Sequence, residues 1–137
     1  MSILSKKTLN LGIIGLSEGN GHPYSWSSIF NGYDYNLMQD CKFPVIPNYL
    51  KKQKFPEDCI SNVQVTHIWT QSKELSEKIA NTCYIENIEK KYEDMIGKVD
   101  GILLARDDAE NHFEMSKPFL LNSLPIYIDK PLSFSLY

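Results

Sequence analysis

Apolar runs and polar stretches alternate five times along this 137-residue chain. Five segments rich in apolar, β-branched or aromatic residues predict strands. They are Leu9–Leu16, Asn62–Thr70, Cys83–Ile88, Asp100–Ala105 and Leu124–Ile128. The run Asp100–Ala105 is almost continuously apolar, as is expected of a strand that helices cover on both faces.

Helical spacing of apolar residues fills the intervals between these strands. It is found at residues 23–31, 73–83, 92–96 and 109–121. Pro23 suits the first position of its helix, and Gly32 is a natural stop at the end. Ser72 is placed to cap the second helix. Pro118 lies inside the last segment, where we expect it to kink the helix.

Five strands that alternate with helices predict an α/β fold in a single domain. The expected architecture is a doubly wound parallel sheet with right-handed crossovers. One connection is too long for this pattern, because residues 33–61 far exceed the roughly 2–6 residues of a typical loop. This insertion is either a packed elaboration with one helical turn near Asn48–Lys52 or a contact surface for another domain or a homo-oligomer.

Composition narrows the functional class. The net charge of −3 and the lack of a basic run argue against a nucleic-acid partner. No apolar segment approaches the roughly 20 residues of a membrane span. Three scattered cysteines, Cys41, Cys59 and Cys83, show no Cys-x-x-Cys spacing. They fit a reducing compartment, so we expect a cytoplasmic protein without a zinc motif.

Polar residues follow every strong strand at the point where it ends. In doubly wound sheets, ligands bind outside the carboxyl ends of the strands, so these residues are expected to share one edge. The cofactor-binding candidates are Gly15, Ser17, Gly19, Asn20, Gly21 and His22 after the first strand, Thr70, Ser72 and Lys73 after the second, Ala105, Arg106, Asp107 and His112 after the fourth, and Asp129 and Lys130 after the fifth.

The first of these turns has the glycine spacing Gly15-x-x-x-Gly19-x-Gly21. Glycines here let backbone N–H groups approach a diphosphate, and the following helix N-terminus favours negative charge. The spacing departs from G-x-G-x-x-G, and no phosphate-loop motif is present. A tight turn without a ligand therefore stays open, and Glu18 would repel a phosphate unless it points outward.

The end of the second strand bears on the choice of cofactor. An acidic residue there usually binds the ribose 2′-hydroxyl of NAD. This chain has Thr70, Ser72 and Lys73 instead, a set able to accept a 2′-phosphate, so NADP is slightly favoured over NAD. Ser72 has the alternative role of a helix cap.

Acidic residues gather after the fourth strand around His112, but they show no metal-ligand spacing. They suit a helix N-terminus on electrostatic grounds alone. No metal site is predicted, and His112 is more typical of a helix-face or hydrogen-bonding histidine than of a catalyst.

The stretch "KVDGILLARDDAENHFEMSKPFLLNSLPIYIDKPLS" resembles the glucose–fructose oxidoreductase/inositol dehydrogenase (Gfo/Idh/MocA) family. In that family the fourth strand leads to an x-x-His-x-Glu helix and the fifth strand ends in Glu-Lys-Pro. The opening "LGIIGL" and its Gly-His turn are also similar. The resemblance covers most of the chain except residues 33–61, and it implies a Rossmann-type domain.

The resemblance further implies an NAD(P)-dependent oxidoreductase that acts on a sugar, a cyclitol or a nucleotide-linked sugar. Lys130 corresponds to the catalytic lysine, which reaches the nicotinamide and the substrate hydroxyl. Asp129 replaces the family's glutamate. The family's second, α+β domain is missing after Pro131, so we expect a cofactor-binding domain that is inactive alone.

Two alternatives remain. A phosphoacceptor receiver domain has the same alternation and a Lys-Pro after its fifth strand, but it needs paired acids after the first strand, where only Glu18 is available. A cofactor-binding sensor or scaffold without catalysis is compatible with the long insertion. For Lys130, the alternative is a solvated lysine before a proline.

Overall fold

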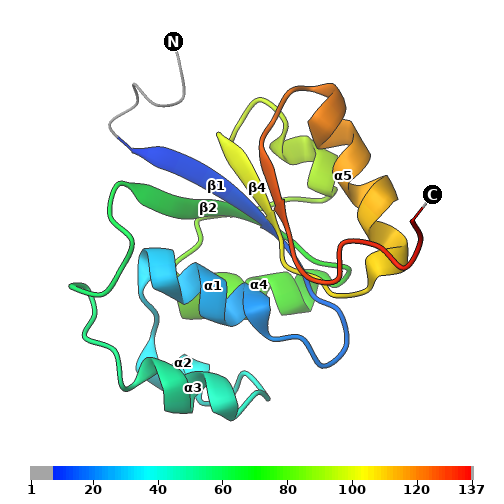
Figure 1. The fold of residues 1–137 in the computed structure, drawn as a ribbon. Helices are drawn as coiled ribbons and strands as arrows, with labels where there is room; N and C mark the ends of the chain where they lie inside the picture. Colours follow the sequence, from blue (N-terminus) through cyan, green and yellow to red (C-terminus); the bar gives the residue numbers. More distant parts are fainter. Residues whose placement is uncertain (1–7, 137) are drawn as a thin grey trace.

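The computed structural model describes residues 8–136. Its five strands form one parallel sheet in the order β3-β2-β1-β4-β5 (Figure 1). The strands are β1 (Leu9–Ile14), β2 (Val63–Trp69), β3 (Asn87–Ile88), β4 (Gly101–Leu104) and β5 (Ile126–Ile128). This order is that of a Rossmann-type sheet, whereas a receiver places its third strand beside the first. The doubly wound α/β prediction is confirmed, and the receiver alternative is wrong.

Helices cover both faces of the sheet. On one face lie α1 (His22–Asn31) and α4 (Lys73–Cys83), and on the other lie α5 (His112–Leu121) and the 3-10 turn η2 (Tyr92–Met95) (Figure 1). A further 3-10 turn, η3 (Ala109–Asn111), precedes α5. No helix in the described part of the chain is long and apolar enough to cross a membrane.

Alternating side chains of the strands divide the core into two layers. Ile13 of β1 packs with the α1 and α4 side, where Ile79 and Cys83 are fully buried. Its neighbour Ile14 packs on the opposite side with Phe119 of α5. Successive strand residues point to opposite faces, so a strand buried on both sides must be apolar at both positions.

Two elements differ from the sequence-based prediction. The third strand was expected at Cys83–Ile88, but α4 extends to Cys83 and Tyr84 takes a left-handed conformation with φ 56°, leaving only Asn87–Ile88 as strand. The helix expected at residues 92–96 is one 3-10 turn, Tyr92–Met95. Apolar residues in a short segment satisfy either assignment, so the packing decides it.

The predicted ends of the other helices are close to those observed. The first helix begins one residue earlier, at His22, and Gly32 follows it with φ 74°. Ser72 caps α4 by accepting a hydrogen bond from the Leu75 backbone N–H. Pro118 lies inside α5.

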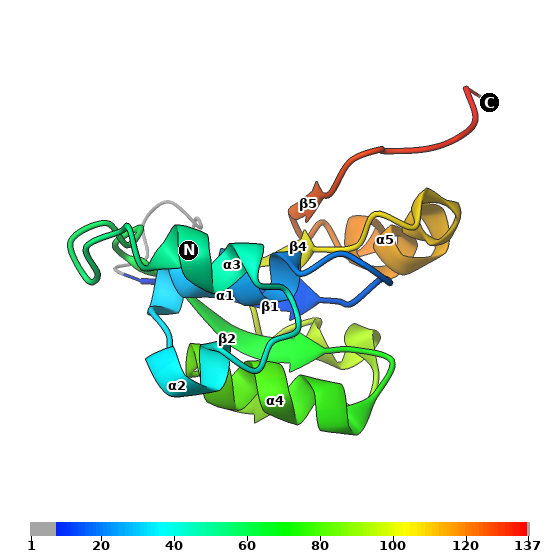
Figure 2. The ribbon, with the colours of Figure 1, turned by 90° about the horizontal axis from the view of Figure 1, so that it is seen from below.

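The insertion forms a partial outer layer against α1 and α4. It contains α2 (Tyr35–Met38), which Asp34 caps, and α3 (Val45–Leu50), which begins three residues before the turn expected at Asn48–Lys52 (Figure 2). Buried Met38 and Leu50 join the core on the α1 and α4 side. The insertion is therefore packed onto the domain, as the first of its two interpretations predicts.

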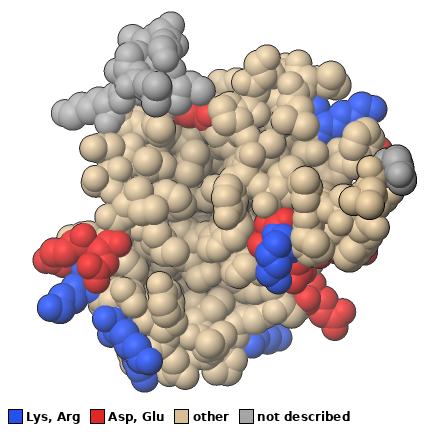
Figure 3. All heavy atoms as spheres, in the orientation of Figure 1, with Lys and Arg blue, Asp and Glu red and all other residues tan. Residues whose placement is uncertain are grey.

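Charged side chains are dispersed over the surface in Figure 3. The face seen there is mostly uncharged, and its Lys, Arg, Asp and Glu side chains lie in small separate groups. This face has no continuous patch of one sign.

Candidate functional site

The strand register places the ends of four strands in one row. Ile14 pairs with Trp69 on β2 and with Leu104 on β4, and Leu104 pairs with Ile128 on β5. The residues that follow therefore leave the sheet at the same edge, at the point where the chain order reverses between β1 and β4. The sequence prediction that the polar turns share this edge is confirmed by the register.

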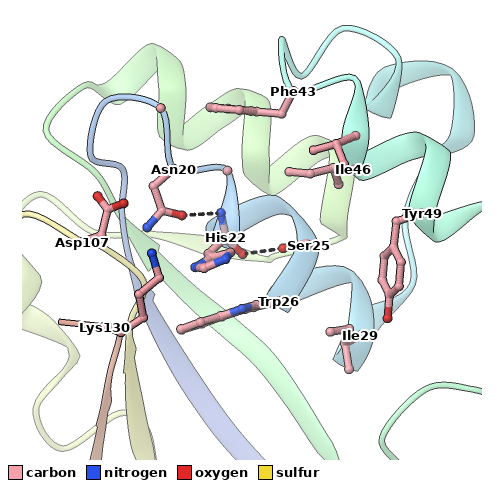
Figure 4. A pocket seen from close by; sticks show the side chains of 13 residues that line it. Asn20, His22, Ser25, Trp26, Ile29, Phe43, Ile46, Tyr49, Asp107 and Lys130 are labelled. Carbon is pink, nitrogen blue, oxygen red and sulfur yellow. Dashed lines mark hydrogen bonds between the residues drawn. The ribbon is translucent and has the colours of Figure 1, made fainter. Parts of the chain in front are cut away.

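A pocket of about 450 Å³ opens at this edge between two different walls (Figure 4). The strand-end wall is polar and consists of Asn20, His22, Asp107 and Lys130. The insertion wall is mostly apolar and consists of Phe43, Val45, Ile46 and Tyr49. Trp26 and Ile29 of α1 lie in the pocket as well.

Two glycines of the first turn make close approaches possible. A Cβ on Gly15 would lie 2.3 Å from Cγ of Pro23, so Gly15 lets β1 pack tightly against α1. A Cβ on Gly21 would lie 2.4 Å from Cδ1 of Ile46, because the insertion packs directly on this residue. Gly19 differs from both, since its φ is 77° and nothing lies near its Cβ position. Only Gly19 leaves open space for a ligand.

The first turn of α1 has few backbone N–H groups to offer an anion. The His22 N–H donates to Asn20 Oδ1 at 2.9 Å, and Pro23 has none. The Tyr24 and Ser25 N–H groups donate to the Gly21 carbonyl. The helix field remains, and within residues 8–136 no hydrogen bond uses the N–H groups of Ser17 and Gly19 in the preceding loop.

Asp129 lies buried behind the strand-end wall and joins two of its residues, Asn20 and His22. Its Oδ2 accepts from Asn20 Nδ2 at 2.9 Å and lies 2.5 Å from His22 Nδ1, and its Oδ1 accepts from the Lys130 N–H at 2.8 Å. The side chain is only 4% exposed. Burial raises the pKa of Asp129, but the hydrogen bonds from Asn20 and His22 outweigh it and hold the pKa below its ordinary value.

His22 is fixed in orientation as well as in position. Its ring stacks on Trp26 with centroids 4.8 Å apart and planes 14° from parallel. Trp26 in turn contacts Tyr127 of β5 edge-on at 5.4 Å. The imidazole is thus held by a carboxylate at one nitrogen and by an aromatic ring at its face.

Lys130 and Asp107 complete the strand-end wall. Lys130 is exposed, forms no ion pair with described residues, and extends toward the same end of the pocket as His22 (Figure 4). Asp107 is held by Ser17, whose hydroxyl donates to Asp107 Oδ1 at 2.6 Å and accepts from the Asp107 N–H at 3.0 Å. Ser17 therefore joins the β1 turn to the β4 turn.

Arg106 lies beneath this edge and makes internal contacts. Its guanidinium pairs with Asp108 through two bonds of 2.9 and 2.5 Å and also donates to the Gly15 carbonyl and to Gln71 Oε1. Gln71 itself binds both the N–H and the carbonyl of Leu16. Arg106 and Gln71 thus hold the start of the β1 turn. Arg106 as a whole residue is only 9% exposed.

His112 is buried and supports the edge from below. Nε2 lies 2.7 Å from the Arg106 carbonyl and Nδ1 lies 3.1 Å from the Leu132 carbonyl. It connects the β4 turn to the segment after Pro131, which agrees with the structural alternative for this residue. Ala105 is fully buried, and its N–H donates to the Ile14 carbonyl.

The three candidates after β2 differ in availability. The Thr70 hydroxyl donates to the Ser72 carbonyl, and the Ser72 hydroxyl caps α4. Lys73 is 84% exposed in its side chain and pairs only with Glu77 at 3.5 Å. Of the three, Lys73 is therefore the charged group that is open to solvent.

Some residues of the pocket were not predicted from the sequence. The insertion wall and Trp26 were absent from the candidates. The position of Trp26 was predictable, because it lies one helical turn after the candidate His22 in α1 and so shares its face. The insertion wall had no local signal, since its place depends on packing against Gly21.

A second cleft of about 640 Å³ lies between α2 and α4, away from the strand ends. Lys42, Lys78 and Asp40 line it. Within residues 8–136, no three His, Cys, Asp or Glu side chains are grouped to hold a metal ion.

Comparison with protein-family models gives a match over residues 43–137 to Gfo/Idh/MocA, the oxidoreductase family with an NAD-binding Rossmann fold. The match covers more than half of the chain. The chain belongs to this family. The Gfo/Idh/MocA match includes Lys130 and the insertion wall but starts after the glycine turn. A comparison with curated proteins gives no match.

Solved structures share the fold at low identity. Myo-inositol 2-dehydrogenase from Lactobacillus plantarum is 19% identical over 95% of this chain, with a TM-score of 0.61. Scyllo-inositol dehydrogenase from Lactobacillus casei, solved with NAD(H) and scyllo-inositol, is 12% identical over 94%, also at 0.61. Biliverdin reductase from a Synechocystis species, solved with biliverdin and NADP+, is 15% identical over 93%, at 0.60.

The chain spans about 30% of the length of these neighbours. A dinucleotide fits the described residues: the loop around Gly19 has free N–H groups and open space, and Lys130 stands at the far side of the same edge.

Proposed function

We propose that this domain binds NAD or NADP and serves an oxidoreductase that moves hydride between the cofactor and a hydroxyl group of a sugar, cyclitol or nucleotide-linked sugar. The observation that carries the proposal is the row of aligned strand ends, which brings Gly19, Asp107 and Lys130 to one pocket. Family membership supports the reaction class.

The residues at this edge of the sheet have separate roles in the proposed function. The N–H groups of Ser17 and Gly19 bind the diphosphate, and Lys73 meets a 2′-phosphate when the cofactor is NADP. The bound cofactor supplies the acceptor for the hydride. Lys130 places its ammonium beside the substrate hydroxyl and favours loss of the hydroxyl proton by stabilising negative charge on oxygen.

We expect this 137-residue chain to bind cofactor by itself, and we expect turnover to need substrate contacts that the described residues do not provide. Cys41, Cys59 and Cys83 carry free thiols. Free thiols suit a reducing compartment, so we place the protein in the cytoplasm.

The chain contains its own probe for cofactor binding. Trp26 lies in the pocket, and the second tryptophan, Trp69, lies on β2. In the Trp69→Phe variant, NADH in the pocket is expected to quench Trp26 emission and to gain emission by energy transfer. Trp69→Phe protein that shows no transfer with either NADH or NADPH would contradict the proposed function.

A further inference from the structure

We propose that His22, oriented by Asp129, is an acid–base residue of this site and accepts the proton of the substrate hydroxyl at Nε2. The inference rests on the proposed function and goes beyond cofactor contact, which is the role expected of His22 from the sequence. It assigns to this domain a proton acceptor, a role that the ammonium of Lys130 cannot fill because it has no lone pair.

The first support is the fixed state of the ring. His22 Nδ1 lies 2.5 Å from Asp129 Oδ2, and the His22 N–H donates to Asn20 Oδ1 at 2.9 Å. A carboxylate accepts hydrogen bonds and cannot donate them, so the proton of this contact belongs to Nδ1. The neutral ring then has its lone pair on Nε2, which is the arrangement a general base requires.

The second support is where the free nitrogen lies. Among residues 8–136, no group hydrogen-bonds Nε2 of His22, although the side chain is only 37% exposed. His22 lines the same pocket as Lys130, and stacking on Trp26 holds the ring plane (Figure 4). Nε2 is thus without a described partner, while Nδ1 contacts Asp129 and the ring face stacks on Trp26.

The third support is that, among residues 8–136, His22 is the one charged partner of Asp129. Its oxygens accept from Asn20, His22 and the Lys130 N–H, and the residue is 4% exposed. A positive imidazolium formed by proton transfer would therefore face a buried carboxylate at 2.5 Å. Such a pair stabilises the charge that develops as the hydroxyl proton arrives.

The step balances with the cofactor of the proposed function. The C–H bond of the alcohol breaks, and its electron pair leaves with the hydride for the oxidised nicotinamide. The O–H bond breaks, and its proton bonds to Nε2 of His22. The carbinol carbon becomes a carbonyl, and the imidazolium afterwards releases the proton to water. In the reverse direction the same ring donates the proton.

The test that needs neither cofactor nor substrate is nitrogen NMR of the 137-residue chain labelled at histidine. The chain has three histidines, so His22→Gln and His67→Gln variants assign the signals. We expect neutral His22 to carry its proton on Nδ1 and to leave Nε2 unprotonated. A His22 ring that carries the proton on Nε2 would overturn the proposal.

Two variants separate Asp129 from its surroundings. In Asp129→Ala the Nδ1–H preference should disappear, whereas in Asn20→Ala it should persist because the carboxylate remains. If Asp129→Ala does not fold, Asn20→Ala and the wild-type tautomer still decide the question. A His22 tautomer that is the same in Asp129→Ala as in wild type would contradict the positioning role of Asp129.

A kinetic readout uses the natural polypeptide that carries this domain, with NAD+ or NADP+ and scyllo-inositol as probes. His22→Gln should lower kcat by about 100-fold or more, the usual size of general base catalysis, while the Kd of NADH changes by less than about twofold. His67→Gln is the matched control and should keep wild-type kcat. A loss confined to NADH affinity would assign His22 to cofactor binding and overturn the proposal.

Failure of the two claims can be told apart. Protein that shows the Nδ1–H tautomer but binds neither NADH nor NADPH contradicts the proposed function. The catalytic role of His22 then falls with it, although its orientation by Asp129 is kept. Protein that binds NADH but has the Nε2–H tautomer keeps the proposed function and loses the inference.

Discussion

The two walls of the pocket are built in different ways. The strand-end wall consists of polar groups from three turns, joined by hydrogen bonds such as Asn20 to Asp129 at 2.9 Å and Ser17 to Asp107 at 2.6 Å. The insertion wall consists of side chains from one segment, and it is attached by the packing of Phe43 and Ile46 on Gly21. Chemistry and shape therefore come from separate parts of the sequence.

The two walls can therefore be changed independently of each other. The strand-end wall depends on the parallel register, which the whole core enforces. The insertion wall depends on local apolar burial, which a single substitution can weaken. Substitutions in the first wall should alter the reaction, and substitutions in the second should alter stability and the shape of the pocket.

The largest effect is expected from Lys130→Ala in the strand-end wall. Loss of its ammonium should lower kcat by about 100- to 10,000-fold, the range of a positioned acid–base group. Because Lys130 is exposed and forms no ion pair with described residues, stability should change little. The check is steady-state hydride transfer by the natural polypeptide, with NADH affinity measured in parallel. Unchanged kcat would show that Lys130 is a solvated lysine without a catalytic role. Cofactor binding by a wild-type protein that shows no turnover would favour the non-catalytic sensor or scaffold.

The next largest effect is expected from Ile46→Ala in the insertion wall. Ile46 is 8% exposed and packs on Gly21, so its loss should lower the free energy of unfolding by about 2–5 kcal/mol. Its neighbour Val45 is 72% exposed, and Val45→Ala should change it by less than about 0.5 kcal/mol. Denaturant unfolding measures both. Equal effects of the two substitutions would show that the insertion does not pack as described.

Sequence reasoning found the first wall because topology alone positions it. Once five strands alternate with helices, residues such as Asp129 and Lys130 must emerge at the edge where Ile128 ends. The Ser72 cap was predictable from local sequence, because the N–H group that it accepts from lies only three positions away, at Leu75. These inferences need only local pattern and the rule for parallel crossovers.

The second wall and the supporting contacts were beyond that reasoning. Phe43 and Ile46 reach the pocket through the fold of residues 33–61, which has no repeating pattern to place it. Gln71 binds Leu16 across 55 positions of sequence, and no motif marks such a pair. The third strand was placed too early because Ile85 is buried like a strand residue while Tyr84 ends the helix.

A smaller effect is expected from Asp129→Asn, because this buried carboxylate lies behind the strand-end wall and does not line the pocket. At neutral pH the substitution should lower the free energy of unfolding by about 1–3 kcal/mol, because hydrogen-bond donors aimed at the carboxylate lose part of their acceptor. The exposed residue Asp40 is the control, and Asp40→Asn should cost less than about 0.5 kcal/mol.

The pH dependence of this difference follows from the lowered pKa of Asp129. The unfolded chain takes up a proton at a higher pH than the folded protein does, so acid favours unfolding. The carboxylate's contribution is present above the ordinary pKa of 3.8 and is lost as the pH falls through the lower folded value. Wild type and Asp129→Asn should therefore converge below pH 3.8. A constant difference across this range would contradict the account.

The smallest effect is expected from Lys73→Ala. Its side chain is 84% exposed, so loss of a contact to a 2′-phosphate should raise the Kd of NADPH by at most about fivefold, equivalent to about 1 kcal/mol, and should leave NADH unaffected. Lys78→Ala, on the same helix and also exposed, is the matched control. Equal changes for NADPH and NADH would remove the basis for preferring NADP.

The most direct test of the central claim is amide NMR of the chain during titration with NADH. If the aligned strand ends form the cofactor site, the largest shifts should appear at Ser17, Gly19, Asp107 and Lys130. The cleft between α2 and α4, with Lys42 and Lys78, should be unaffected. Shifts confined to that second cleft, or no shifts with either NADH or NADPH, would contradict the account.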